Sequence, residues 1–165
     1  MGGRQHIAYD PLWTMTARAV KGVGVTVVLC ATVLCAAGAG AAARGQTAPS
    51  IWDGVYTDAQ ATRGRERYKA SCATCHSEDL LGASGPALVG EFFMQRWNGT
   101  SVNDMLVTLR QTMPQDAPDS LGTPGYLDLI AFLLKNNSVP PGATELPGEA
   151  GALQRIRITD RAPAR

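Results

Sequence analysis

The spacing of apolar residues predicts two amphipathic helices in the second half of the chain. Apolar side chains three and four positions apart line one face of a helix. This spacing occurs twice, at Val102, Met105, Leu106 and Leu109 and at Leu129, Ile130, Leu133 and Leu134. We expect the first helix to start near Ser101 and to end near Thr112. Thr123 is the expected N-cap of the second helix, with Pro124 where a missing N–H costs nothing, and this helix ends near Asn136.

A third helix is predicted earlier in the chain, where a capping signal precedes it. Thr57 and Gln60 fit a capping box, in which the hydroxyl and the amide side chain each satisfy an exposed backbone N–H. This helix is expected to end near Ser71 and to lead directly into Cys72. The sequence between and around these helices has no clear strand pattern, so the predicted fold class is all-α.

The connections between the three predicted helices are long. Residues 77–100 and 113–122 lie outside any helical pattern, and the helices themselves bury little apolar surface. A long structureless loop in a compact domain is unusual unless it packs against something. A large, flat, apolar cofactor would provide that surface.

The N-terminal composition predicts an export signal over residues 1–45. Two basic residues precede an uncharged stretch from Gly22 to Ala43 that ends in small residues, as signal peptidase requires. Cleavage is expected after Ala43 or Gly45. Two alternatives stay open, because 22 uncharged residues are long enough for a membrane anchor and residues 1–14 could be an over-long gene start. The protein is therefore expected outside the cytoplasm, in the periplasm, with membrane contact only if the segment is uncleaved.

By composition, the remaining chain divides into a linker (46–56), the helical domain (57–139) and a tail rich in Pro and Gly (140–165). The tail has too few apolar residues to fold alone. A short part of it could dock onto the domain through Leu153, Ile156 and Ile158. The formal net charge is only +1, with no run of basic residues, so no nucleic-acid partner is expected.

Cys72-Ala73-Thr74-Cys75-His76 is the attachment signature of a c-type haem. Two cysteines three residues apart on a helical turn point the same way and can form thioethers with the two vinyl groups of one porphyrin. The histidine that follows lies beneath the ring and can bind the iron. A redox dithiol, a zinc site and a structural disulfide are rival interpretations. A redox dithiol usually belongs to a strand–helix unit, which is not visible here, and a zinc site would need further Cys or His ligands. A structural disulfide would leave His76 unexplained.

The second axial ligand of the iron is predicted to be Met113. The chain has no histidine after His76, so a methionine is the expected partner. Met105 lies on the apolar face of a predicted helix, and Met94 follows two phenylalanines, so both are interpreted as packing residues. Met113 lies in a loop 37 residues after His76. Pro114 restricts Met113 to extended backbone, which stiffens the loop that holds a weak Fe–S bond.

Several short motifs in residues 57–139 resemble class I c-type cytochromes, in particular small monohaem cytochromes allied to quinoprotein alcohol or sugar dehydrogenases. The matching pieces are Gly64-x-x-x-Tyr68, the CATCH sequence, Gly85-Pro86-Ala87-Leu88, Trp97-x-Gly99, Met113-Pro114 and Tyr126-x-Asp128-Leu129-Ile130-Ala131-Phe132-Leu133. The resemblance implies three main helices with long loops wrapped around one covalently bound haem c. It also implies that the first and last helices cross with Gly64 against Tyr126 and Ile130.

The resemblance further assigns roles around the haem. The carbonyl of Pro86 is expected to accept the Nδ1–H of His76 and so to fix the tautomer of the ligand. Leu88 and Trp97 are expected to line the haem pocket.

Six ligands from protein and porphyrin leave no open position on the iron, which favours electron transfer over catalysis. The resemblance implies an extracytoplasmic dehydrogenase as electron donor and a respiratory oxidase or another cytochrome as acceptor. Two alternatives are a permanently bound electron-transfer subunit that docks through the 140–165 tail, and a haem sensor or peroxidase in which Met113 is labile.

Charge predicts only weak electrostatic steering of partners. Residues 50–140 carry seven Lys/Arg and ten Asp/Glu, a formal balance of −3. One basic cluster stands out in the first predicted helix, where we interpret it as a solvated face: Arg63, Arg65, Arg67 and Lys69.

Overall fold

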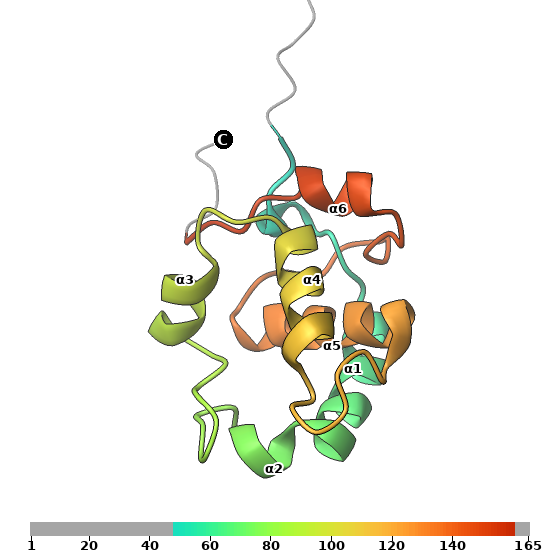
Figure 1. The fold of residues 1–165 in the computed structure, drawn as a ribbon. Coiled ribbons are helices and arrows are strands. Elements are labelled where there is room, and N and C mark those ends of the chain that lie inside the picture. Colours follow the sequence, from blue (N-terminus) through green and yellow to red (C-terminus); the bar gives the residue numbers. More distant parts are fainter. Residues whose placement is uncertain (1–47, 161–165) are drawn as a thin grey trace, which may run out of the picture. The chain divides into compact units, whose positions relative to one another are not determined.

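The computed structural model of the chain describes residues 48–160. These residues form a short 3-10 helix, η1 (Ile51–Asp53), and six α-helices: α1 (Asp58–Ser71), α2 (Ala73–His76), α3 (Glu91–Trp97), α4 (Val102–Thr112), α5 (Gly122–Asn136) and α6 (Ala150–Arg155) (Figure 1). Within them the only extended pairing is two isolated β-bridges, so the all-α prediction is confirmed. The expected export signal, with its anchor alternative, lies outside the described residues. None of the described helices is long and apolar enough to cross a membrane.

The three predicted helices are α1, α4 and α5, and their starts test the capping predictions. Ser101 and Asp104 form a complete capping box at α4. Thr57 caps α1 by accepting the N–H of Gln60, but the capping box predicted there is only half formed. The Gln60 side chain instead accepts the backbone N–H of Leu146 at 2.9 Å, so it binds the C-terminal segment.

The predicted N-cap of α5 is wrong. Thr123 lies inside the helix, which begins at Gly122 after an N-cap at Leu121 that makes no side-chain hydrogen bond. The chain enters the helix through a turn in which Gly122 has a φ of 62° and donates its N–H to the carbonyl of Asp119. The turn itself satisfies one of the backbone N–H groups that a helix start leaves exposed.

Short elements form in segments where the sequence pattern predicted none. The helix α3 interrupts the expected loop 77–100 and buries Phe93 and Trp97. Residues 50–56, counted as linker, contain η1 and bury Ile51 and Tyr56.

The C-terminal segment packs against the domain and connects two distant parts of it. Leu153, Ile156 and Ile158 are buried, as their apolar character suggested. On one side, the N–H of Ile51 donates to the carbonyl of Arg157 at 2.9 Å. On the other side, the N–H of Ile158 donates to the carbonyl of Thr100 at 2.9 Å, just before α4. The segment therefore holds the start of α4 beside the N-terminal part of the domain.

The centre of the fold is the contact between α1 and α5, which cross at Gly64. A Cβ on Gly64 would lie 1.9 Å from the carbonyl oxygen of Asp128 and 2.8 Å from the Cβ of Phe132. The predicted crossing at Gly64 is present, but its partners differ from the predicted Tyr126 and Ile130. The backbone of α5 packs directly against Gly64. The nearest groups belong to Asp128 and Phe132, which lie two residues further along α5 than the predicted partners.

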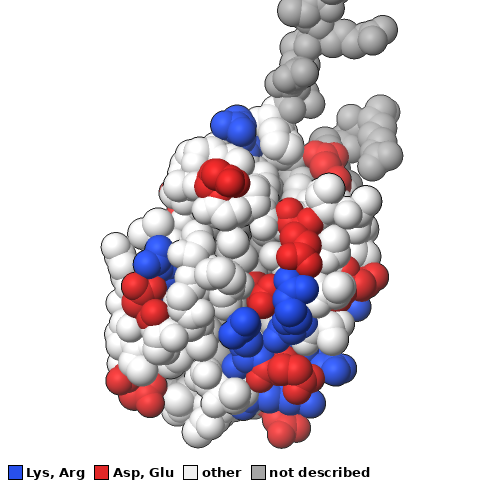
Figure 2. Space-filling model, turned by 90° about the vertical axis from the view of Figure 1, so that its right-hand side faces the viewer, with Lys and Arg blue, Asp and Glu red and all other residues white. Residues whose placement is uncertain are grey.

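The basic cluster on α1 is more than a solvated face. Asp128 is 4% exposed, and its carboxylate binds the guanidinium groups of Arg63 at 2.9 Å and Arg67 at 3.1 Å. Arg63 also pairs with Glu145 of the C-terminal segment at 2.8 Å, and these partners raise its pKa. Figure 2 shows acidic side chains interspersed among the basic ones on this face. Half of the cluster therefore neutralises a buried carboxylate at the helix crossing.

Candidate functional site

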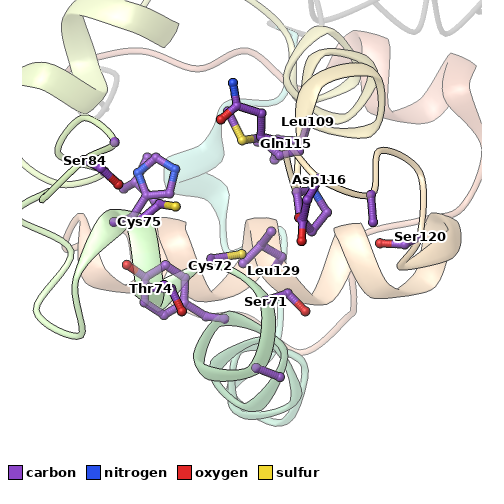
Figure 3. Close-up of a pocket in the computed structure, with 18 of the residues that line it drawn as sticks. Ser71, Cys72, Thr74, Cys75, Ser84, Leu109, Gln115, Asp116, Ser120 and Leu129 are labelled. Atoms are coloured by element: carbon purple, nitrogen blue, oxygen red, sulfur yellow. The ribbon is translucent and has the colours of Figure 1, made fainter.

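A cavity of about 810 Å³ lies beside the CATCH motif. Its walls come from the end of α1, from α2, from the loop 84–88, from the end of α4 with the loop after it, and from α5. In Figure 3, Cys72 and Cys75 lie on one side of the cavity, and Leu109, Gln115 and Asp116 lie on the other. The two long connections predicted from the sequence thus contribute opposite walls of one space.

Both cysteines of the motif are free thiols that line this cavity. Cys72 is partly buried, and this burial, with the neighbouring Cys75, raises the pKa of its thiol to about 11. Cys75 is exposed at the cavity edge. The α2 turn between them brings both cysteines to the same cavity, as a double attachment to one ring requires.

His76 is buried and held in a fixed orientation. Its Nδ1 lies 2.8 Å from the carbonyl oxygen of Pro86, and since a carbonyl only accepts, Nδ1 carries the proton. The other ring nitrogen, Nε2, is then free of a proton and available to a metal. Gly85 allows the loop to approach the ring, because a Cβ there would lie 2.8 Å from Cε1 of His76.

Met113 is the methionine that lines this cavity within residues 48–160. It is the C-cap residue of α4, with φ −134° and ψ 146°, the extended backbone that Pro114 was predicted to impose. The hydroxyl of Tyr126 donates to its carbonyl oxygen at 2.6 Å, which ties this loop to α5. Met105 is fully buried in the core, and neither it nor Met94 lines the cavity.

Leu88 and Trp97, both expected in the haem pocket, occupy different places. Leu88 lines the cavity beside the motif, whereas Trp97 lines a second cavity of about 510 Å³ next to it. Pro86, Leu88, Leu109 and Met113 line both cavities. Trp97 is therefore adjacent to the space that holds the cysteines instead of part of its wall.

Four residues that line the cavity beside the motif were not predicted as part of the site, because the sequence analysis assigned them only to helix packing or to helix motifs. Leu109, Leu129 and Leu133 give the cavity apolar walls on α4 and α5. Tyr68 also lines it, and its hydroxyl donates to the carbonyl of Ser77 at 2.5 Å, which fixes the chain just after His76. Periodicity could not separate these positions from core, because cofactor and core both require apolar side chains.

The residues around the cavity fit a covalently bound haem. Two free thiols, an imidazole whose Nδ1 is satisfied, and a thioether face one apolar space. An imidazole and a thioether are the axial ligands that c-type cytochromes use. No group of three or more His, Cys, Asp or Glu side chains in the described part of the chain could hold a metal ion by itself.

Comparison with known proteins agrees with this chemistry. Residues 59–133 match the family described as "Cytochrome C oxidase, cbb3-type, subunit III". A segment of 35 residues is 51% identical to "Cytochrome c-551" of Bacillus subtilis (strain 168), and this segment covers 21% of the chain and 31% of that relative. The chain thus matches about a third of the length of this relative. No solved structure matches the chain.

Proposed function

We propose that residues 59–133, which match the cbb3-type oxidase subunit III family, are a cytochrome c domain that holds haem c covalently, and that this protein carries single electrons outside the cytoplasm. When bound, the haem iron supplies the one-electron couple between Fe(II) and Fe(III). The observation that carries the proposal is the arrangement around the main cavity. There the imidazole of His76 is fixed by Pro86, and the thioether of Met113 lines the same apolar space as the two thiols.

In this proposal each residue has a stated task. Cys72 and Cys75 hold the group by thioether bonds, so it cannot dissociate during repeated oxidation and reduction. His76 and Met113 would supply the two protein ligands of the iron. The hydrogen bond to Pro86 keeps the imidazole oriented and increases its basicity. With both sides held, substrate has no position at the iron, and this favours transfer of electrons over catalysis.

Burial of the site supports the same conclusion. Leu129 and Leu133 are buried on the α5 wall, and Leu109 is half-buried on the α4 wall. An apolar wall limits water around a redox centre, and burial is one way in which a protein tunes the reduction potential. Cys75 is exposed at the edge, so the part of the ring nearest to it is the natural point of contact with a partner.

The proposed donor is an extracytoplasmic dehydrogenase, and the proposed acceptor is a respiratory oxidase or another cytochrome. The family whose model matches is described as a subunit of a cbb3-type oxidase, which supports an oxidase as the acceptor. Ser71, Thr74, Ser84 and Gln115 make the rim of the cavity largely polar and uncharged, with Asp116 as its charged member. Salt should therefore have only a modest effect on association.

The alternative of a permanently bound subunit with the tail as its docking arm is less favoured. The apolar residues of the tail that a docking arm would use are buried in the domain itself, and Leu153 and Ile158 are 0% exposed. Residues 140–160 would have to leave their own core before they could bind another subunit. A free carrier does not require this.

The test is the binding of carbon monoxide to the reduced protein, followed by absorption. A carrier with both axial positions held binds no carbon monoxide, and Met113→Ala opens a position and binds it. Met94→Ala is the matched control and behaves like the wild type, since Met94 does not line the main cavity. Rapid binding by the wild type would reject the carrier and favour a sensor or peroxidase with a labile Met113.

A further inference from the structure

The loop that carries Met113 forms one wall of the main cavity. This Met113 loop (residues 113–121) connects α4 to α5. Five of its residues line the cavity besides Met113: Pro114, Gln115, Asp116, Ala117 and Ser120. Inside the loop, the N–H of Ala117 donates to the carbonyl of Pro114 at 3.0 Å, and the N–H of Ser120 donates to the carbonyl of Ala117 at 3.3 Å. These contacts are local, so they shape the loop without attaching it to a helix.

An ion pair joins the end of the Met113 loop to α4. Nε of Arg110 donates to Oδ1 of Asp119 at 2.6 Å, and Nη2 of Arg110 donates to Oδ2 of Asp119 at 2.9 Å. Two parallel hydrogen bonds fix the orientation of the two groups as well as their distance, because a planar guanidinium matches a planar carboxylate. Arg110 precedes Met113 in the chain, and Asp119 follows it. The ion pair therefore closes a ring of chain that contains Met113.

The backbone of Asp119 gives this ion pair a second role. Asp119 has a φ of 62°, a left-handed conformation that residues other than glycine rarely adopt. Such a residue keeps this conformation only when its surroundings hold it. Arg110 holds the Asp119 carboxylate, and the Asp119 carbonyl accepts the N–H of Gly122 at 3.4 Å. The ion pair thus offsets a backbone cost at the end of the loop.

Arg110 and Asp119 lie outside the space that the haem would fill. Neither residue lines the main cavity or the cavity beside Trp97. Their side chains are 40% and 54% exposed. A change at either position therefore leaves the cavity wall intact, and it reaches the site through the loop that the ion pair fastens.

We propose that the ion pair between Arg110 and Asp119 holds the Met113 loop in the position that keeps the Met113 sulfur on the iron, an inference that rests on the proposed function. A bond from a thioether sulfur to iron is weak, so movement of the loop competes with it. The Tyr126 hydroxyl fixes the start of the loop at the Met113 carbonyl, and the ion pair fixes its end. An external ligand reaches the iron only when the loop opens, and opening breaks the ion pair. Arg110 and Asp119 are positioning residues, because they act through Met113.

The experiment measures the affinity of the oxidised holoprotein for imidazole, an external ligand that competes with Met113 for Fe(III). At about pH 8 imidazole is mostly neutral, so a change in protein charge does not attract or repel it. Its binding removes the long-wavelength band of methionine–iron ligation, which gives the readout. Asp119→Asn removes the charge and keeps a side chain that tolerates left-handed backbone. This variant and Arg110→Gln should each bind imidazole about fivefold more tightly than the wild type, the upper end of the effect of an exposed ion pair.

Three further variants separate the ion pair from general effects of charge. Arg65→Gln breaks an exposed pair with Glu66 on α1, and it should leave the affinity for imidazole unchanged. The double variant Arg110→Gln/Asp119→Asn should bind imidazole like either single variant, because the same interaction is lost in all three. Arg110→Lys keeps the charge but loses the two-point contact, so its affinity should lie between that of the wild type and that of Arg110→Gln.

Wild-type affinity for imidazole in both single variants would overturn the proposal and leave the proposed carrier intact. Effects that add in the double variant would overturn it too, and so would a lower melting temperature with unchanged affinity, which indicates a purely structural pair. Absence of covalent haem from the wild type, or wild-type affinity in Met113→Ala, would instead overturn the proposed function. If the variants do not fold, a crystal structure of the wild-type holoprotein decides. The proposal requires Arg110 and Asp119 paired while Met113 binds the iron, and a Met113-bound iron with these side chains apart would reject it.

Discussion

Replacement of Gly64 by alanine tests the contact on which the fold depends. The new Cβ would lie 1.9 Å from the carbonyl oxygen of Asp128, whereas ordinary contact begins at 3.4 Å. The two helices must therefore separate by about 1.5 Å at the crossing, because the obstructing atom belongs to the α5 backbone and cannot rotate away. The separation also loosens the contact between Tyr68 and Phe132, whose ring centroids are 5.2 Å apart.

The expected loss of stability follows from two opposing effects. Overpacking of a well-packed contact costs about 1–3 kcal/mol, and a clash with backbone belongs at the upper end of this range. Alanine recovers about 0.5–1 kcal/mol because it is a better helix former than glycine. The net destabilisation is about 2 kcal/mol, which lowers the melting temperature by roughly 10 °C in a domain of this size.

The assay is thermal and guanidinium unfolding of the holoprotein, followed by circular dichroism. Gly151→Ala is the matched control, because Gly151 also lies in a helix but has no atom within 4 Å of an added Cβ. The two substitutions change the unfolded chain alike, so their difference isolates the packing at the crossing. Gly151→Ala should be neutral or slightly stabilising. Equal stability of the two variants would refute the account of the α1–α5 crossing.

Two further predictions concern the start of α4 and the C-terminal segment. Hydrogen bonds from Ser101 lower the pKa of the Asp104 carboxyl below its usual 3.8. The stability that the Asp104 carboxylate contributes is therefore present above about pH 4, and it is lost as the pH falls through the lowered pKa. Asp104→Asn should thus be less stable than the wild type at neutral pH, and a difference in unfolding free energy that persists unchanged at about pH 2 would contradict this. Leu153→Ala should lower the free energy of unfolding by about 2–4 kcal/mol, because Leu153 is 0% exposed. Leu81→Ala, at a side chain that is 66% exposed, should lower it by almost nothing. Equal denaturation midpoints for the two variants would show that the C-terminal segment is not part of the core.

Local sequence signals predicted the parts of this fold that depend on neighbouring residues. The helix α4 (Val102–Thr112) was predicted from spacing alone, and the capping hydroxyl of Thr57 is where the sequence placed it. The haem-attachment chemistry was predictable because the five residues of the CATCH motif are adjacent in the sequence. The extended backbone of Met113 followed from the proline after it.

Features that depend on contacts between distant residues were not predictable from one sequence. Gln60 satisfies an N–H of the C-terminal segment 86 residues away, so its capping pattern gave the wrong partner. Likewise Asp128 was one acidic residue on a mostly apolar helix, and only the packed structure pairs it with two arginines of α1. The same limit applies to Trp97, whose place beside a second cavity depends on how α3 packs near α4.

The most direct test of the central claim is the absorption spectrum of the purified protein, taken oxidised and reduced and combined with acid–acetone extraction. We expect haem to stay with the polypeptide and to show a low-spin spectrum with the weak long-wavelength band of methionine–iron ligation. We also expect replacement of both Cys72 and Cys75 by serine to make any bound haem extractable. Wild-type protein that contains no haem, or that releases it into the acetone, would contradict the claim that this cavity is a covalent haem site.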